Sequence, residues 1–274
     1  MIDDRVGQEG ADAFARGASV SGAGASGAQP SGAEAAGAEA SAAEASGTEA
    51  SGAKVPPSSS PGTVSLIGGN VILRPITAND GPAIVAATQA HNLSDNRWTS
   101  IPTANDIDSY LARALEGVAA GHTLAFVTTL ADTGQVVGAS RFWRYEPANR
   151  KLEIGHTWVA ADWQRSFVNT EAKYLMLRYA FEHLACLRVE FQTDELNAVS
   201  RQAILRLGAT FEGIARKERI MPDGRQRNTA RFAIVDDDWP RVRDGLESRI
   251  RRAGGVPSLV VQSLSRNGIR IESR

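Results

Sequence analysis

One segment of the chain, residues 164–169, has a sequence context that suits the binding of a phosphate group. It reads Gln-Arg-Ser-Phe-Val-Asn and directly precedes an apolar helical pattern over 169–184. A helix N-terminus presents backbone N–H groups without intrahelical partners and the positive end of the helix dipole, so it can bind a pyrophosphate. The alternative is an ordinary capped helix, in which Glu171 is favourable in the first turn.

Candidate proton acceptors lie on two predicted strands that flank this segment. Glu153 and His156 belong to a strand predicted over 152–159, and Glu190 belongs to a strand predicted over 187–193. Each can take a proton from a reacting group, directly or through water. Side chains alternate along a strand, so we expect Glu153 and His156 on opposite faces, where they do not act together. The alternatives are solvent as the proton acceptor and structural roles for all three side chains.

A second helix is predicted over 197–207 and ends at Gly208. Taken locally, Asn197 is an N-cap and Ser200 lies in the first turn. The order of strand, loop, long helix, strand and second helix over 152–211 resembles the GNAT acyltransferases. In detail it resembles their Rim-type branch, which includes enzymes that acetylate the N-termini of ribosomal proteins.

The resemblance implies acetyl-CoA as co-substrate. In GNAT proteins the loop before the long helix binds the pyrophosphate. The backbone of the preceding strand pairs with the pantetheine arm, and one of its amides donates to the thioester oxygen. The Rim-like pattern adds an asparagine side chain that meets the pantetheine. The expected contacts here are Thr157, Trp158, Val159, Gln164, Arg165, Ser166, Phe167, Val168, Asn169, Thr170 and Asn197.

The sequence departs from the general family pattern at the loop and at the catalytic acid. Phe167 and Asn169 replace two small residues, as in the Rim-type branch, and Phe167 fits if its φ stays negative. Where many GNAT enzymes carry a tyrosine that protonates the thiolate, this chain has Ile204. Ser200 lies one turn earlier on the same face, and the Rim-like pattern implies that it hydrogen-bonds the departing sulfur. Glu153, on the strand with the thioester contacts, is the first candidate for the base.

The resemblance places the acceptor site between two early helices and the last hairpin. The segment 95–102 joins the helices and offers Trp98. A basic group on the hairpin suits an acidic acceptor, a carboxylate-bearing amine or the adenosine phosphate of CoA, or else is a solvated face. That group consists of Arg216, Lys217, Arg219, Arg225, Arg227 and Arg231.

The expected activity is N-acetyl transfer from acetyl-CoA by direct attack of a primary amine. The acceptor is a protein N-terminus or a small-molecule amine. The alternative is a non-catalytic acyl-CoA-binding or sensor protein on the same fold, which Phe167 and Ile204 would suit. A third hypothesis is an interaction module built on the N-terminal tail.

Strand and helix patterns around these residues predict the fold class. The expected fold is α+β or α/β, the GNAT fold, with a mixed central β-sheet and helices on both faces. Strands are predicted over 71–75, 124–130, 135–143, 152–159, 187–193, 211–220 and 225–235, and helices over 77–90, 103–120, 169–184, 197–207 and 238–250.

The first sixty residues lack the large apolar side chains that a folded core needs. Ala, Gly, Ser and Glu dominate them, a five-residue pattern repeats within them, and a Pro/Ser-rich stretch follows. We therefore expect residues 1–62 to be a disordered tail and linker, 63–252 the GNAT domain, and 253–274 a C-terminal extension without assignment.

Charge and composition limit the partners. Three basic and eight acidic residues give segment 1–62 a net charge of −5, so the remainder of a chain with −1 overall carries +4. That excess suits one anionic cofactor and argues against nucleic acid. The single cysteine, Cys186, excludes a disulfide framework and a Cys-based zinc site. We expect no metal, no membrane span, no secretory signal, a cytoplasmic location, and a monomer or homodimer.

Overall fold

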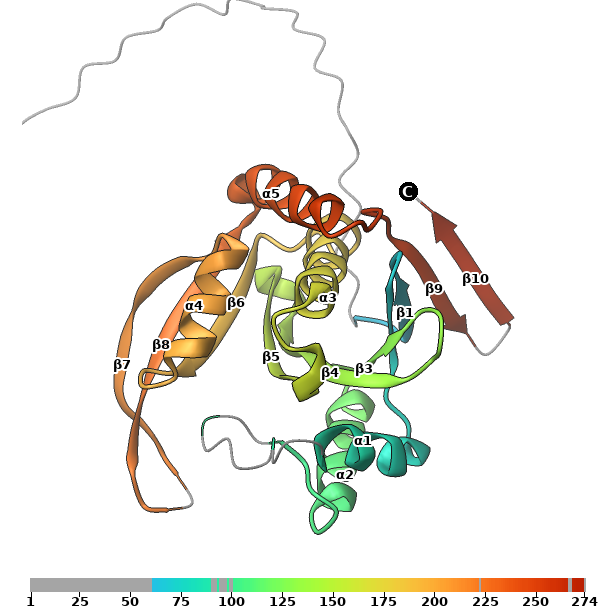
Figure 1. The fold of residues 1–274 in the computed structure, drawn as a ribbon. Coiled ribbons are helices and arrows are strands. Elements are labelled where there is room, and N and C mark those ends of the chain that lie inside the picture. The colour runs from blue at the N-terminus through green and yellow to red at the C-terminus, as the bar shows by residue number, and fades with distance from the viewer. Residues whose placement is uncertain are drawn as a thin grey trace, which may run out of the picture. The chain divides into compact units, whose positions relative to one another are not determined.

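A computed structural model describes residues 61–89, 93, 98, 101–221, 223–265 and 268–273, with side chains as far as residue 263. The predicted tail lies almost entirely outside these residues. The strands of the described part form one ten-stranded sheet in the order β10-β9-β1-β2-β3-β4-β5-β6-β8-β7 (Figure 1). Their bounds are β1 Val64–Ile67, β2 Val71–Pro75, β3 Leu124–Leu130, β4 Val136–Glu146, β5 Lys151–Val159, β6 Arg188–Asp194, β7 Thr210–Ile220, β8 Gln226–Val235, β9 Val260–Ser265 and β10 Gly268–Ser273.

Helices cover both faces of the sheet, as predicted (Figure 1). One apolar core joins α1 and α2 to the face of β3 that carries Ala125 and Val127. The other core joins α3 and α5 to the opposite face, through Phe126, Phe142 and Leu175. Strand alternation explains why neighbouring residues of β3 enter different cores. The helices are α1 Gly81–Gln89, α2 Ile107–Ala119, α3 Phe167–Arg178, α4 Ala198–Leu207 and α5 Trp239–Arg252.

The predicted order of strands and helices is confirmed between residues 71 and 252, and the sheet is mixed. β5 and β6 run parallel, while the other paired strands of the described part are antiparallel. Two additions were not predicted. β1 precedes the first predicted strand, and the unassigned segment 253–274 supplies β9 and β10, with β9 pairing along β1.

The sheet opens at its only parallel pair within the described residues. β5 and β6 are in register at Lys151, Leu152 and Glu153, which lie opposite Arg188, Val189 and Glu190, and no pairing between the two strands follows. β6 continues along β8 as far as Asp194. The second half of β5 therefore has no strand on its β6 side.

Candidate active site

The open edge of β5 carries the predicted pantetheine contacts Thr157, Trp158 and Val159. All three lie beyond the last residue that pairs with β6. On the other side, β5 remains hydrogen-bonded to β4, where Trp158 lies opposite Ala139 and Val159 opposite Gly138. An edge that is held on one side and open on the other can pair with an extended ligand. The contacts themselves remain a prediction.

A β-bulge at His156 interrupts β5. Gly155 lies opposite Arg141 and Trp158 opposite Ala139, so β5 has one residue more than β4 over this interval. His156 takes up the extra length with a φ of 51°, which is uncommon for a residue other than glycine.

The bulge changes which side chains share a face. The His156 ring lies 5.1 Å from the ring of Trp143, and Trp143 is the register partner of Glu153. Glu153 and His156 therefore lie on the same face, that of α1 and α2. The expectation from simple alternation, which put them on opposite faces, is wrong because the bulge breaks the alternation.

Glu153 is buried and under-satisfied. It is 8% exposed, and burial raises the pKa of its carboxyl to about 6, with Arg144 opposing and Glu190 adding to the shift. Its Oε2 has no hydrogen-bond partner, and Arg144 Nη1 is 3.8 Å away. A carboxylate with this pKa is ionised at neutral pH and basic enough to accept a proton.

The two alternative bases, His156 and Glu190, are less suited than Glu153 to accept a proton from the amine. The His156 ring reaches solvent but is surrounded by protein atoms, and burial followed by Arg141, Arg219 and Arg113 lowers its pKa to about 4. Glu190 accepts a hydrogen bond of 2.8 Å from Arg188 Nε. That pairing is the structural role considered for a strand glutamate.

The other face of β5 is tied to α3 by a buried lysine that sequence reasoning missed. Lys173 is 5% exposed, and its Nζ donates to Ser140 Oγ at 2.9 Å and to Thr157 Oγ1 at 2.7 Å. Burial lowers the pKa of Lys173 to about 7. Its position inside the apolar helical pattern was the available signal. The network fixes the side chain of Thr157 beneath the open edge.

Glu171 does not lie in the first turn of α3, because the helix begins at Phe167. It is 1% exposed and accepts hydrogen bonds from Asn70 N at 2.8 Å, Asn70 Nδ2 at 2.9 Å and Val71 N at 3.3 Å. It thereby fastens α3 to the turn between β1 and β2. The first-turn role considered for Glu171 is therefore wrong, although α3 does have a capped N-terminus at Ser166.

The loop before α3 accommodates Phe167 because a neighbouring residue, and not Phe167, adopts the positive φ. Arg165 takes the left-handed conformation with a φ of 59°, and Phe167 is not among the residues with positive φ. Ser166 is the N-cap: its Oγ accepts from Val168 N at 3.2 Å and donates to the Trp163 carbonyl at 2.6 Å. Gln164 Nε2 donates to the Val159 carbonyl at 3.2 Å, which fastens the loop to β5.

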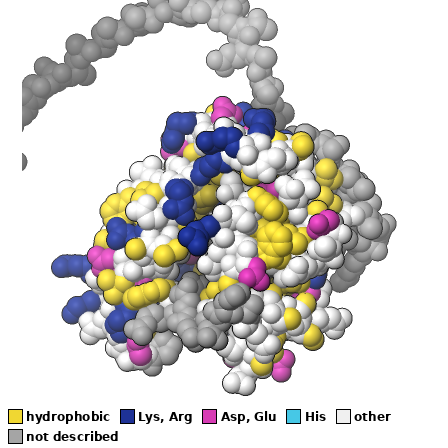
Figure 2. Space-filling view, in the orientation of Figure 1, with side chains coloured by type: hydrophobic (Ala, Val, Ile, Leu, Met, Phe, Trp, Pro, Cys, Tyr) yellow, Lys and Arg dark blue, Asp and Glu magenta, His cyan; other side chains and the backbone are white. Residues whose placement is uncertain are grey.

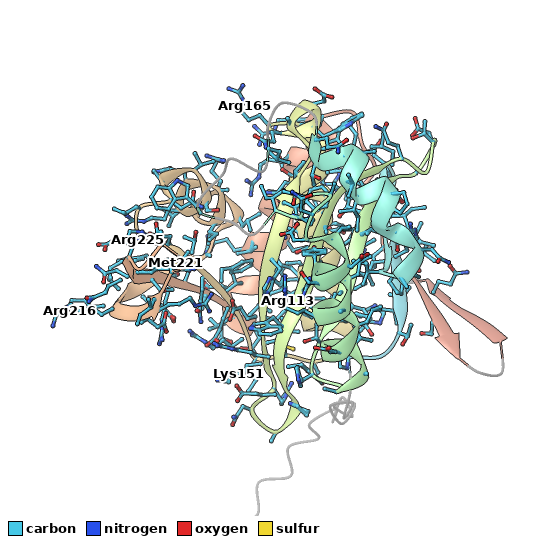
Figure 3. The ribbon with its side chains drawn as sticks, turned by 90° about the horizontal axis from the view of Figure 1, so that it is seen from below. Arg113, Lys151, Arg165, Arg216, Met221 and Arg225 are labelled. Atoms are coloured by element: carbon cyan, nitrogen blue, oxygen red, sulfur yellow. The ribbon has the colours of Figure 1, made fainter. Side chains whose placement is uncertain are left out.

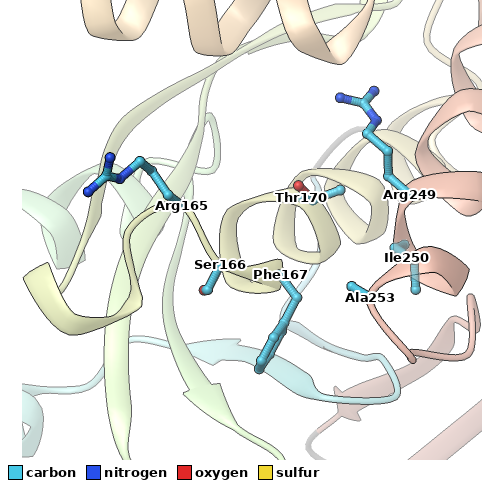
Figure 4. A pocket seen from close by; sticks show the side chains of 7 residues that line it. All are labelled: Arg165, Ser166, Phe167, Thr170, Arg249, Ile250 and Ala253. Carbon is cyan, nitrogen blue, oxygen red and sulfur yellow. The ribbon is translucent and has the colours of Figure 1, made fainter.

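A pocket of about 300 Å³ lies where this loop and α3 meet α5 (Figure 4). Asn169 follows on the first turn of α3. The pocket contains two arginines, and burial followed by repulsion from Arg252 and Arg206 lowers the pKa of Arg249. Figure 2 shows Lys and Arg side chains gathered over α5 and continuing down the same face. Open helix N–H groups with nearby guanidinium groups form a donor set that fits the phosphates of CoA. The lining residues are Arg165, Ser166, Phe167, Thr170, Arg249, Ile250 and Ala253.

The start of α4 shows the local capping that was considered. Asn197 is 5% exposed, and its Oδ1 accepts from Ser200 N at 3.0 Å. The Asn197 side-chain amide nitrogen and the Ser200 hydroxyl are not used by this cap. Ile204, one turn later, packs against the apolar core, which explains why a hydrophobic residue suits that position.

Trp98 contacts the hairpin of β7 and β8. The Arg225 guanidinium lies over its ring, 5.2 Å from the centroid, and Arg225 Nη2 donates to Asp194 Oδ2 at 2.6 Å. In Figure 3, Arg113 lies on the side of α2 that faces the hairpin, whereas Arg216, on β7 of the hairpin, points away from α2. Trp98 and the β7–β8 hairpin are therefore in contact at the place where the family resemblance puts an acceptor site, and the acceptor site itself stays a prediction.

Two searches of the described ranges found nothing. No group of three or more His, Cys, Asp or Glu side chains in them is placed to hold a metal ion. No helix within them is long and apolar enough to span a membrane.

Comparisons with known proteins bear on this site. A family model described as an acetyltransferase (GNAT) domain matches residues 70–210, just over half of the chain. A solved structure from T. thermophilus, named provisionally as an acetyltransferase, is 31% identical, with a TM-score of 0.60, and the match covers 68% of this chain and 96% of that one. A GCN5-related N-acetyltransferase from Brucella melitensis is 29% identical, with a TM-score of 0.62 and coverage of 67% and 84%.

Two further relatives carry Rim-type or ribosomal names. A protein of Bacillus subtilis (strain 168), provisionally named ribosomal N-acetyltransferase YdaF, is 28% identical over 106 residues, which are 39% of this chain and only 57% of that protein's length. RimJ of Mycobacterium smegmatis, solved with CoA-disulfide, is 23% identical, with a TM-score of 0.57 and coverage of 69% and 94%, and it shares the fold. The first name supports the predicted Rim-type branch. The chain belongs to the GNAT acetyltransferase family.

Proposed function

We propose that the protein transfers the acetyl group of acetyl-CoA to a primary amine, which attacks the thioester directly. The opening of the sheet between β5 and β6 carries this proposal, because it leaves a strand edge open next to the N-terminus of α3. The open edge suits pantetheine and the helix N-terminus suits the pyrophosphate. One extended ligand, acetyl-CoA, combines these two groups.

The chain's own residues divide the binding among them. Residues 164–170 would hold the phosphates, and the backbone of Thr157, Trp158 and Val159 would hold the pantetheine and face the thioester oxygen. The side-chain amide of Asn197 would contact the pantetheine from the other side of the opening. CoA supplies the thioester, and the protein supplies position and proton transfer.

Two residues would move or direct the proton. The attacking amine must be neutral, and Glu153, as a carboxylate, takes the proton that the amine loses as the carbon–nitrogen bond forms. The carbon–sulfur bond then breaks, and the Ser200 hydroxyl donates a hydrogen bond to the departing sulfur. The buried, under-satisfied state of Glu153 supports this assignment over His156 and Glu190.

The acceptor is a primary amine of one of two kinds. The ribosomal name of the B. subtilis relative favours a polypeptide N-terminus. A small-molecule amine uses the same chemistry. In both cases the amine would approach from the face with Glu153 and His156, between α2 and the β7–β8 hairpin.

Calorimetric titration of acetyl-CoA into the full-length protein, followed by thiol release with pooled amines and peptides, tests the proposal. Saturable binding with amine-dependent thiol release is the expected result. Binding without thiol release over a broad panel would favour the non-catalytic acyl-CoA sensor. Absence of binding would overturn the proposal.

A further inference from the structure

Arg141 is a buried guanidinium that has no anionic partner among the described residues. It lies on β4, opposite Gly155, is 4% exposed, and packs 4.8 Å from the centroid of the Tyr110 ring. Its Nε is buried without a hydrogen-bond partner, and within the described residues no ion pair of this side chain is found. A buried arginine without a partner is costly, so this arrangement suits a site that an anion completes.

Other arginines surround the same face. Arg219 on β7 lies directly opposite Arg227 on β8, and like charges at such a pair are destabilising. Arg227 has a buried Nε without a hydrogen bond, although Asp194 Oδ2 lies 3.9 Å away. Arg141, Arg219 and Arg113 all lower the pKa of His156, so their charges converge on the bulge of β5.

The acids that the structure describes in this region already have arginine partners. Asp194 is bound by Arg225 at 2.6 Å, and Glu218 by Arg231. Glu190 pairs with Arg188 in the same way. Glu153 has Arg144 at 3.8 Å. These pairs leave Arg141 and the opposed Arg219 and Arg227 without full compensation on the face where the acceptor would lie.

We propose that the acceptor is a primary amine that carries a carboxylate, and that Arg141, with Arg219 on the facing hairpin, binds this carboxylate. A guanidinium matches a carboxylate through paired N–H donors, and a desolvated site strengthens the contact. This assignment rests on the proposed function and names its acceptor class. Two sources fit the same chemistry: a free amino acid, or a peptide N-terminus with an acidic residue near its first position.

Matched acceptor pairs test the proposal by thiol release from acetyl-CoA with the full-length protein. One set compares glycine, β-alanine and glutamate with their amides. The other compares the peptide amide Ala-Asp-Ala with Ala-Asn-Ala. The wild-type protein should favour the acid member roughly 30-fold or more in kcat/KM. A nearby carboxylate raises the pKa of the amine, so in the first set this preference runs against intrinsic reactivity. Which set responds identifies the source of the carboxylate.

Three variants test whether Arg141 and Arg219 cause the preference for the acid acceptor. Arg141→Met should abolish it while keeping or raising Tm, because Arg141 forms no ion pair with any side chain that the structure describes. Arg219→Gln should weaken it. Arg216→Gln removes the same charge from an exposed, outward position of β7 and should leave it unchanged. Equal use of acids and amides by the wild type, or an intact preference in Arg141→Met, would overturn the proposal.

A binding measurement covers the case in which no pair turns over. Succinate and glutarate are titrated while the ring signals of His156 are followed by NMR, with assignment through His156→Gln. Saturable shifts in the wild type that disappear in Arg141→Met support the carboxylate site, and their absence in the wild type overturns it. Acetyl-CoA titration in parallel shows whether the proposed function fails independently.

Discussion

The two faces of the sheet differ in whether their buried polar side chains are hydrogen-bonded. On the α3 side, Lys173 donates to two hydroxyl groups and Glu171 accepts three hydrogen bonds. On the α2 side, the buried side-chain atoms without partners in the described part of the chain are Arg141 Nε, Glu153 Oε2 and Arg227 Nε. A side that binds its ligand mainly through backbone needs its side chains satisfied by the protein. Under the proposed function, the α2 side would bind and deprotonate an acceptor, and its free donors and acceptors would serve that ligand.

Glu153→Gln gives the largest expected change. Loss of a general base should lower kcat/KM about a hundredfold or more at neutral pH. In the wild type the log of kcat/KM should fall more steeply with acid below about pH 6. The neutral fraction of the amine already falls with acid at these pH values, and protonation of Glu153 adds to that fall, so the variant should lose the steeper segment.

The stability of Glu153→Gln separates this role from a structural one. The folded pKa of Glu153 lies above its usual 4.5, so the folded state binds more protons and wild-type stability falls as pH rises from 4.5 to about 6. The variant should lack this fall and melt no lower than the wild type at pH 7. An unchanged pH profile of kcat/KM would show that another group is the base.

Ser200→Ala should lower turnover about ten- to a thousandfold while acetyl-CoA affinity holds, because one positioned donor to the sulfur is lost. Only the backbone N–H of Ser200 takes part in the Asn197 cap, so the variant should keep α4 and its Tm. Stopped-flow turnover and calorimetric titration measure the two effects. An unchanged rate would remove Ser200 from the mechanism.

Glu171→Gln tests the α3 side, where the buried polar side chains are hydrogen-bonded. The amide would keep one oxygen for the backbone N–H groups of Asn70 and Val71, but it would place a donor against Asn70 Nδ2 and remove the negative charge that strengthens all three bonds. We expect a loss of about 2–3 kcal/mol in unfolding free energy. Urea unfolding measures it. Arg216→Gln serves as a surface control. If Glu171→Gln lost less unfolding free energy than Arg216→Gln, the Glu171 side chain would not be tied to the β1–β2 turn.

Lys173→Met should have the smallest effect and a distinctive pH dependence. The folded pKa of about 7 lies below the usual 10.5, so the unfolded state binds more protons between these values and wild-type stability rises with pH there. The variant should be more stable by about 1–2 kcal/mol at pH 7. That advantage should shrink as the pH approaches 10. Destabilisation at pH 7 would show that the bonds to Ser140 and Thr157 outweigh the burial cost.

Periodic patterns predicted most of the fold, and the misses have local causes. The order of elements from β2 to α5 and the cap at Asn197 follow from spacing and residue type. β9 and β10 were missed because 253–274 lacks a clear alternation. The burial of Lys173 and the isolation of Arg141 depend on partners far apart in the chain. The shared face of Glu153 and His156 depends on one positive φ, which alternation does not encode.

The bulge of β5 can also be described in genetic terms. Thr157 faces Ser140 and Trp158 lies opposite Ala139, as both would in an uninterrupted strand, so His156 is the inserted residue. An in-frame deletion of its codon would keep both neighbours in register while removing the bend. A single codon thus separates a regular strand from one that places an imidazole on the same face as Glu153. Sequence alignments of this region are therefore better compared by length than by residue identity.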